Sequence, residues 1–400
     1  MNILVIGNGF DLAHGLPTRY SDFLDFIELY MIVYEIGKEK IVGWENSDNL
    51  LKIYIASIFI KQSKESNKIK SESNIFLDIQ NNIWLQYFKE KEKSKKSDVG
   101  WIDFEKEISK MIKYINQVFN KNNEETKWYK KNKSKLFDNC DMDFFNREKK
   151  YDNVKKLLED LNILIRCLEL YLSIFINKTQ VIFKQPDIDN LKIDKILNFN
   201  YTNTYERVYG INHGNYIEYN YIHGKADFNN TIGTNNMVLG IDEYLPEDRK
   251  NVDVEFIEFK KFYQRIYKGT ESKYKKWVDD IKGDYLKYLE EKAEQGKVKY
   301  SLYNDEQLLT LSSINLNIKK LKKHNVYIFG HSLDVTDGDV LRELILNDNV
   351  YTTIFYPDKK ELGRKIVNLV KIIGQDELIR RTGRSTKTIE FKQQQDMVRI

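Results

Sequence analysis

The sequence predicts an α/β protein whose doubly wound, parallel, Rossmann-like sheet carries large helical insertions. Short apolar runs rich in β-branched and aromatic residues occur near both ends and in the middle of the chain. Several of them end in Gly, Asn or His, where a ligand-facing loop would begin. Long charged stretches between these runs repeat apolar residues at helical spacing. Parallel strands joined by helices produce this alternation.

The first expected strand contains the apolar run Ile3–Ile6 and continues into a glycine pair, Gly7 and Gly9. A short run without polar residues fits a strand that is covered on both faces, which predicts a central position in the sheet. Further strands are expected at 195–204, 220–224, 237–243, 326–333 and 351–356. Together these runs predict one parallel sheet.

Helices are expected between the strands. Ser21 is a suitable N-cap for the first of them. Helical spacing of apolar residues also predicts helices at 47–62, 151–185 and 255–293, whereas the lysine-rich segments 89–98 and 120–135 are expected to be solvated loops. The resulting division has a core formed by 1–35, 190–245 and 320–400, one helical insertion at 36–189 and a second at 246–319.

Composition excludes several classes of protein. The 400 residues, of which 41% are hydrophobic, are enough for a large core or for two domains. Lys and Arg number 64 against 60 acidic residues, so the net charge of +4 does not favour a nucleic-acid partner. No apolar run approaches the ~20 residues of a membrane span, and the N-terminus has no basic region or cleavage site. We therefore expect a cytoplasmic protein without a membrane partner.

The two cysteines predict neither a disulfide framework nor a structural zinc site. Cys140 and Cys167 are far apart and lie in no pair motif. Cys167 stands inside an apolar helical pattern, where a free cysteine behaves as a small core residue. No metal is expected.

The glycine pair after the first strand is typical of a loop that approaches a phosphate, because Gly7 and Gly9 have no Cβ. The dinucleotide fingerprint G-x-G-x-x-G is incomplete, since Leu12 replaces its third glycine and no acidic residue ends a second strand about twenty positions later. From these residues alone, a phosphate-binding loop and a structural strand-to-helix turn both remain open.

A wider pattern resembles the sirtuin signature, in which G-A-G-x-S is followed by G-I-P-D-F-R. Gly7, Gly9, Gly15 and Pro17 fall on matching positions, while Asp11 stands where sirtuins carry serine. Three later segments resemble sirtuin-like segments in the same chain order. They are 197–206 with Asn200, 221–225 with His223, and 328–340 with Gly330, Ser332 and Asp337.

Three segments resemble the AbiH family of bacteriophage abortive-infection proteins. They are "GNGFDLAHGLPTRYSDFL" near the N-terminus, "WIDFE" at 101–105 and "GHSLDVTDGD" near the end. This resemblance implies antiviral defence in a bacterium. The sirtuin-like pattern implies hydrolysis of NAD, as substrate, at the nicotinamide–ribose bond. Deacetylation is a weak alternative, because the acetyl-lysine sirtuins carry a four-cysteine zinc module and this chain has two cysteines.

The resemblance assigns roles to particular residues. His223 would accept a proton from water or from a ribose hydroxyl, and Asn200 would hold that water or hydroxyl in line. The residues expected to bind the nucleotide are Gly7, Asn8, Gly9, Phe10, Asp11, Pro17, Arg19, Gly330, Ser332 and Asp337. The glycine loop would hold the pyrophosphate, Arg19 would neutralise it, and Ser332 would contact the adenosine ribose.

Several of these residues also have structural interpretations. His223 could be a turn residue bonded to backbone, Asn200 could serve an unusual backbone angle, and capping is preferred for Asp339. The roles of His14, His331 and Asp334 stay open. Trp101 is expected to anchor the helical insertion. Glu105 shares its helix face, and a position of Glu105 in the site is the less favoured alternative.

Two other functions remain open. The same pocket could belong to a nucleotide sensor that signals to a partner without cleavage, or the lysine-rich loops could bind nucleic acid, which is the less favoured reading. The sequence does not determine whether NAD is cleaved or only bound, whether a phage-encoded activator triggers the protein, or whether the chain forms a homo-oligomer.

Overall fold

The fold was analysed in a computed structural model of the 400-residue chain. The structure describes residues 1–36, 41, 43–49, 51–53, 55–56, 75, 79–94, 103–120, 149–210, 216–243, 245, 248–270, 272–301, 321–383 and 387–400. Residues 95–98 and 121–135 of the expected lysine-rich loops 89–98 and 120–135 lie outside these residues, as do Cys140, Trp101 and part of the expected helix at 47–62.

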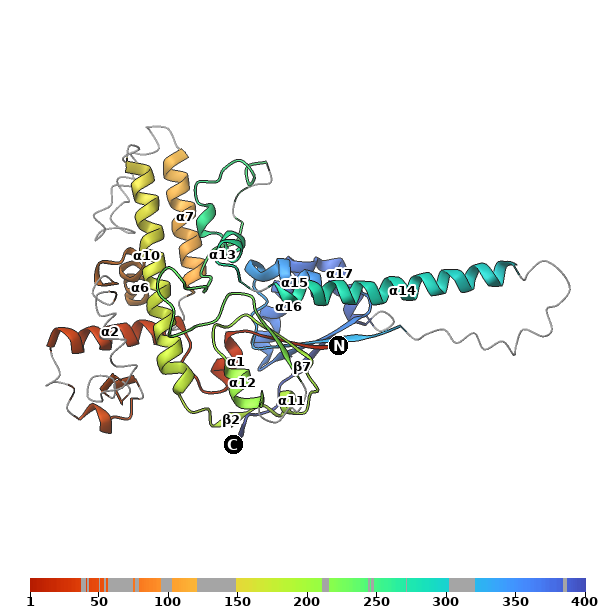
Figure 1. Cartoon of the computed structure of the whole chain (residues 1–400), viewed down its shortest axis with the longest axis horizontal. Coiled ribbons are helices and arrows are strands. Elements are labelled where there is room, and N and C mark those ends of the chain that lie inside the picture. The colour runs from red at the N-terminus through yellow and green to blue at the C-terminus, as the bar shows by residue number, and fades with distance from the viewer. Residues whose placement is uncertain are drawn as a thin grey trace.

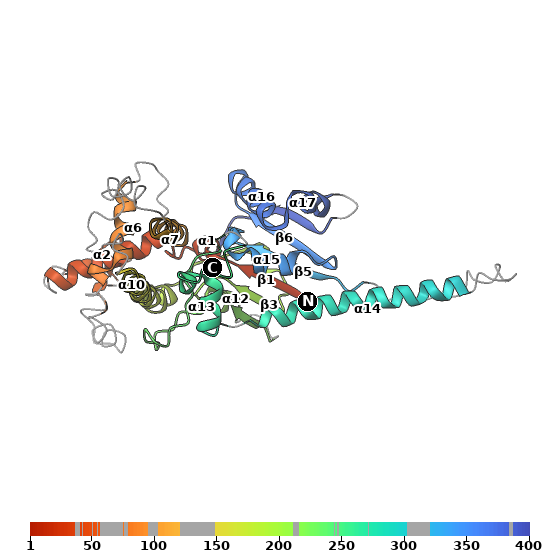
Figure 2. The same cartoon turned by 90° about the horizontal axis from the view of Figure 1, so that it is seen from above.

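Six parallel strands form one sheet in the order β4-β3-β1-β5-β6-β7. Their bounds are β1 Asn2–Ile6, β3 Lys195–Asn198, β4 Glu218–Tyr221, β5 His324–Phe329, β6 Val350–Tyr356 and β7 Ile389–Gln393. In chain order, the third, second and first strands are followed across the sheet by the fourth, fifth and sixth, which is the order of a doubly wound α/β fold. Figure 2 shows β6, β5, β1 and β3 in this succession. The predicted fold class is confirmed.

Strand β1 is central, as its apolar run predicts. Ile3 pairs with Lys195 of β3 on one side and with Val326 of β5 on the other. Both faces of the strand are covered, so Ile3 and Leu4 are each fully buried although they point to opposite sides.

Two families of helices cover the two faces. On one face the apolar core includes Ile3, Val5 and Ile328, packed under α14 (Lys273–Ser301), α15 (Gly338–Ile345), α16 (Lys359–Ile373) and α17 (Gln375–Thr382). On the other face Leu4 and Ile6 pack with α1 (Asn8–Ala13), α11 (Pro186–Asp189) and α12 (Thr204–Tyr209). Alternate side chains of one strand therefore supply two separate cores.

Two expectations for the strands are wrong. Residues 237–243 form no strand; only Ile241 makes an isolated bridge, to Lys260. Met237, Leu239 and Ile241 are apolar because they are buried in the core of the helical insertion, and not because they pair in the sheet. Strand β7 was not expected, because this edge strand is mostly polar and buries only its first residue, Ile389.

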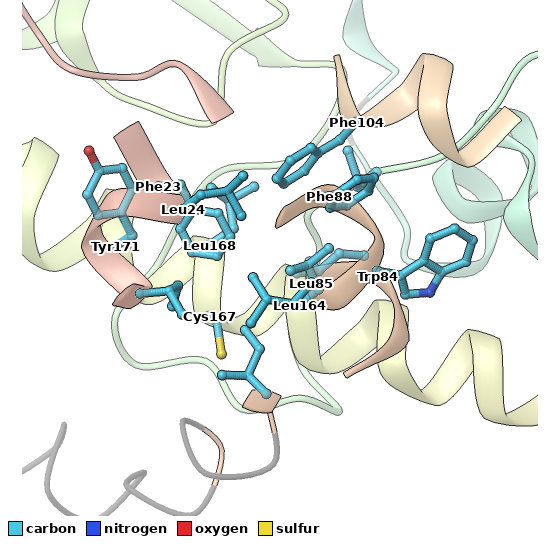
Figure 3. Close-up of a cluster of buried hydrophobic side chains, with 14 of the residues drawn as sticks. Phe23, Leu24, Trp84, Leu85, Phe88, Phe104, Leu164, Cys167, Leu168 and Tyr171 are labelled. Carbon is cyan, nitrogen blue, oxygen red and sulfur yellow. The ribbon is translucent and has the colours of Figure 1, made fainter. Parts of the chain in front are cut away.

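The first insertion has its own hydrophobic core (Figure 3). It packs helices α2 (Tyr20–Ile36), α6 (Ile83–Ser94), α7 (Phe104–Asn120) and α10 (Lys150–Leu170), to the left of the sheet in Figure 1. Phe88 stacks on Phe104 with ring centroids 4.0 Å apart, and Cys167 is buried among them, as expected for a small core residue. Helix α6 includes 89–94, so this part of the expected loop 89–98 is helical.

The expected helix 151–185 ends early. Helix α10 continues into a π-helical turn at Tyr171–Phe175 and a 3-10 turn at Ile176–Lys178. Strand β2 (Phe183–Lys184) then pairs antiparallel with the C-terminal strand β8 (Val398–Arg399). Short 3-10 turns also occur at Trp44–Asn46 and Ile79–Asn81.

The second insertion contains two helices where one was expected at 255–293. A 3-10 turn at Ile257–Phe259 leads into α13 (Lys261–Tyr267), and α14 follows after Gly269. Gly269 has φ +60°, a left-handed conformation that ends α13. Helix α14 lies against the sheet at its start and then projects from the body of the molecule (Figures 1 and 2). No helix among the described residues is long and apolar enough to cross a membrane.

Candidate functional site

The carboxyl ends of four strands bring together the loops that carry the expected site residues. Gly7 follows β1, Phe199 follows β3, Ile222 follows β4 and Gly330 follows β5. In a doubly wound sheet the strand order reverses between β1 and β5, and ligands bind outside the carboxyl ends at that point. The fold therefore favours this edge of the sheet as the functional site.

A cluster of buried polar side chains occupies this edge. The Nε2 of His223 lies 3.1 Å from the Oδ1 of Asp337, and the Nε2 of His331 lies 3.5 Å from the Oδ2 of the same carboxyl group. All three side chains are buried. Asp337 belongs to the 3-10 turn Val335–Asp337, just before α15. Two imidazoles, separated by more than 100 residues, thus face one carboxylate.

Two charged residues from the helical insertions complete the cluster. The Nζ of Lys261, on α13, lies 3.0 Å from the Oδ1 of Asp337 and 2.8 Å from the Oε2 of Glu105, on α7. Lys261 is buried and Glu105 is mostly covered. The ammonium therefore bridges a carboxylate of the sheet domain and a carboxylate of the first insertion.

The pKa values within the cluster follow from burial and from these contacts. Burial alone would raise the pKa of Asp337, but Lys261 and His223 outweigh it and hold that pKa well below its usual range. Burial and the nearby charge of Lys261 lower the pKa of His223, although Asp337 opposes them. Burial raises the pKa of Glu105 to about 7, against the effect of Lys261. Asp337 is thus ionised and His223 uncharged near neutral pH.

The Nε2 of His223 has no well-directed hydrogen bond in the described part of the chain, although it is buried. Its distance to Asp337 suits a hydrogen bond, so only the direction of the contact is poor. Poorly aligned contacts of this kind are common in catalytic sites that hold no substrate. Phe199 fixes the two imidazoles in place, with ring centroids 5.4 Å from His223 and 4.4 Å from His331.

His331 has a defined tautomer. The backbone N–H of Leu333 donates to its Nδ1 over 2.9 Å, so the proton of a neutral ring lies on Nε2, toward Asp337. Leu333 has φ +56°, a left-handed conformation that is unusual for a residue with a side chain. The left-handed backbone at Leu333 thus accompanies the hydrogen bond from its N–H to this imidazole.

The glycine pair after β1 packs against the glycine after β5. The N–H of Gly9 donates to the carbonyl of Gly330 over 2.8 Å, and the N–H of Phe10 donates to the carbonyl of Gly7 over 2.8 Å. A Cβ on Gly9 would lie 2.8 Å from that Gly330 oxygen. Gly9 thus makes a packing contact between two loops, and its role in nucleotide binding stays a prediction. Its N–H, like that of Phe10, is already used within the protein.

Asn200 and Asp11 connect the β1 and β3 loops. The Nδ2 of Asn200 donates to the carbonyl of Gly7 over 3.0 Å, and the hydroxyl of Thr202 donates to the Oδ2 of Asp11 over 2.6 Å. Burial raises the pKa of Asp11 to about 6, and its Oδ1 has no hydrogen-bond partner in the part of the chain that the structure describes. Both residues lie at the expected edge, and both have structural contacts there.

The remaining expected residues are more dispersed. Arg19 and Ser332 are exposed. The Oδ1 of Asn8 accepts from the hydroxyl of Thr18 over 2.7 Å, and the carbonyl of Pro17 accepts from Tyr171 over 2.6 Å. Roles for these residues in nucleotide binding stay predictions.

Other ambiguous residues have structural partners. The Nδ1 of His14 lies 2.7 Å from the carbonyl of Phe10, and its Nε2 lies 2.8 Å from the hydroxyl of Tyr209. Asp334 accepts from the N–H of Thr336, and Asp339 pairs with Arg265 over 2.8 Å. Asp339 lies inside the first turn of α15, so the expected capping role is wrong for this residue.

Lys261 was not singled out from the sequence, and Glu105 was noted as a helix-face neighbour of Trp101 that reaches the site in the less favoured of two interpretations. Their signals are weak, because a lysine in a lysine-rich insertion gives no indication of burial. Among the described residues, no group of three or more His, Cys, Asp or Glu could hold a metal ion.

The fold and the site define a doubly wound α/β protein with a buried His–Asp–Lys cluster at the carboxyl edge of its sheet. The family model "Bacteriophage abortive infection AbiH" matches residues 3–356. The chain belongs to this family and is accordingly a phage abortive-infection protein. Comparison with curated proteins and comparison with solved structures each found no match.

Proposed function

We propose that this abortive-infection protein acts by hydrolysing NAD at the bond between nicotinamide and ribose, which would deprive an infected cell of NAD. The contact between His223, after the outermost strand β4, and Asp337, after β5, carries the proposal. An uncharged, buried imidazole beside an ionised carboxylate is the arrangement that a general base requires. The resemblance of four segments to sirtuin-like proteins supports NAD as the substrate.

The reaction balances with water as the co-reactant. The C–N bond breaks with its electron pair going to the pyridinium nitrogen, so nicotinamide leaves as a neutral molecule and the ribose gains oxocarbenium character. The oxygen of water then bonds to the ribose carbon, and the proton of that water passes to His223. With Nε2 directed to Asp337, Nδ1 is the nitrogen left to accept the proton. Asp337 would then stabilise the imidazolium.

The test is incubation of the purified full-length chain with NAD, with and without extract of phage-infected cells, and quantification of free nicotinamide. We expect His223→Ala to reduce the rate by ~10²–10⁴-fold, the usual size of general-base assistance, while NAD binding is largely kept.

His324→Ala is the matched control. His324 is also buried and lies 3.2 Å from an aspartate, Asp284, but it stands at the amino end of β5, on the opposite edge of the sheet. This variant should keep the parent's rate per folded molecule. If His223→Ala retains most of the parent's turnover, the proposed chemistry is wrong.

A nucleotide sensor is the second candidate. It is favoured by the contacts of Lys261 with Asp337 and with Glu105. These contacts connect both helical insertions to the Asp337 carboxylate, so that binding of a nucleotide there would be transmitted to the insertions. A parent chain that binds NAD but releases no nicotinamide under any of these conditions would favour the sensor.

A further inference from the structure

The bridge made by Lys261 is the contact that the proposed chemistry leaves unused. Its ammonium lies 3.0 Å from the Oδ1 of Asp337, and the Nε2 of His223 lies 3.1 Å from that same oxygen. One carboxylate oxygen thus faces an ammonium and an imidazole together. The ammonium also lies 3.3 Å from the hydroxyl of Thr336 and 2.8 Å from Glu105.

We propose that Lys261 is a positioning residue of the site: its ammonium holds the Asp337 carboxylate against His223 and keeps that imidazole in its uncharged, proton-accepting form. This role rests on the proposed function of His223 as a base. It assigns to the second helical insertion a residue on which the chemistry of the sheet depends.

The role of Lys261 depends on repulsion between its ammonium and a protonated His223. A proton on His223 would place a second positive charge at the oxygen that Lys261 already neutralises, in a site from which water is mostly excluded. Without Lys261, no Lys or Arg among the described residues would pair with Asp337, and the carboxylate would favour a charged His223. An imidazolium cannot act as a base.

The other groups around His223 act in identifiable directions. Arg265, on the same helix as Lys261, adds positive charge and opposes protonation of His223. Asp337 favours protonation, and His331 shares that carboxylate through its other oxygen. Glu105, on α7, lies 2.8 Å from the ammonium of Lys261 and holds it in place.

The experiment is an NMR titration of the histidine rings in the full-length chain, which has five histidines. His223→Gln identifies the signal of His223 by its loss. In the parent, His223 should titrate below the ordinary value of about 6.5. In Lys261→Met, a variant of similar length without charge, the pKa of His223 should rise by about one pH unit or more. Lys261→Arg, which keeps the charge, should restore most of the parent's behaviour.

Lys260→Met is the matched control. Lys260 is the neighbouring residue and is equally buried, but its ammonium pairs with Glu243 over 2.8 Å. This variant should leave the titration of His223 unchanged. The proposal is overturned if folded Lys261→Met titrates as the parent does, or if Lys260→Met shifts His223 by as much.

Should Lys261→Met fail to fold, Glu105→Gln provides a second test. This substitution removes the negative charge of Glu105 and leaves the ammonium of Lys261 paired with Asp337. The pKa of His223 should therefore equal that of the parent or be lower. A higher pKa would contradict the proposal. The titration requires no NAD. A shifted His223 in a chain that never releases nicotinamide would reject NAD hydrolysis while supporting the bridge. If nicotinamide is released, Lys261→Met should also move the acid limb of the pH–rate profile to higher pH.

Discussion

Two backbone segments of the site, the loop after β1 and the loop after β5, pack closely against each other. Gly330 has φ +66°, and a Cβ there would lie 2.1 Å from the backbone nitrogen of Phe10. A Cβ on Gly7 would lie 2.8 Å from the Cα of His331. The two glycine-containing loops, about 320 positions apart, therefore pack so closely that a side chain at Gly7 or Gly330 would clash with the other loop.

We expect Gly330→Ala to lower the free energy of unfolding by about 2 kcal/mol or more, because backbone atoms cannot move aside as a flexible side chain can. Gly9→Val should also lose stability, together with any nucleotide binding. Gly269→Ala is the control, since Gly269 has φ +60° but nothing within 4 Å of its added Cβ. It should show only the left-handed strain of roughly 1–2 kcal/mol. Urea denaturation measures all three, and equal losses at Gly330 and Gly269 would argue against the close contact.

Helix α14 packs against the sheet through its first turns. Trp277 and Ile281 are buried in the core on one face of the sheet, and the Nε1 of Trp277 donates to Glu218 of β4 over 3.0 Å. Leu286, further along, is 57% exposed. The helix therefore depends on its first turns for tertiary stability.

Trp277→Ala should cost about 3–5 kcal/mol of unfolding free energy, the usual range for truncating a buried aromatic side chain. Leu286→Ala, on the same helix, should change stability by no more than about 0.5 kcal/mol, because its side chain contributes little buried area. Thermal or urea denaturation distinguishes the two. A similar loss in both variants would mean that the projecting part of α14 is also buried in solution.

At the scale of the whole molecule, the strand order and the two insertions assemble the site. The sheet brings His223 and His331 to one edge, and the insertions add Lys261 and Glu105. A second contact, between Lys106 of α7 and Asp334 over 3.0 Å, ties the first insertion to the same loop after β5. Three parts of the chain therefore meet at one carboxylate cluster.

The free energy of unfolding is expected to depend on pH through the buried imidazole of His14. Burial lowers the pKa of His14 to about 4, from an ordinary value near 6.5. As pH falls through this window the unfolded chain binds a proton at His14 while the folded chain does not. The free energy of unfolding therefore falls by up to about 1.4 kcal/mol per pH unit from this group.

His14→Gln should remove that dependence, so its stability relative to the parent should improve steadily from about pH 6.5 to pH 4. Asp11 acts in the opposite direction, because its pKa is raised to about 6, but it is present in both chains. Urea denaturation of parent and variant across pH 4–8 makes the comparison. Parallel stability curves would show that His14 is not held uncharged.

The fold class and the central position of β1 follow from the amino-acid sequence alone. An apolar run as short as Ile3–Ile6 is stable only when both faces are covered, so its burial can be read locally. The short motifs that follow the strands also placed His223 and Asp337 at the carboxyl edge, because parallel strands end at the same side. The sequence pattern was sufficient to predict features that depend on residues close together in the chain.

Other features of the fold and the site depend on long-range packing. The apolar segment 237–243 is buried under an insertion and not in the sheet, and the polar edge strand β7 has no local signal. The Gly9–Gly330 contact joins residues that are 321 positions apart in the chain. The contact between Lys261 and Asp337 joins residues that are 76 positions apart. Burial of a charged or backbone group depends on which distant segment covers it, and that is set by long-range packing, which no periodicity in one segment encodes.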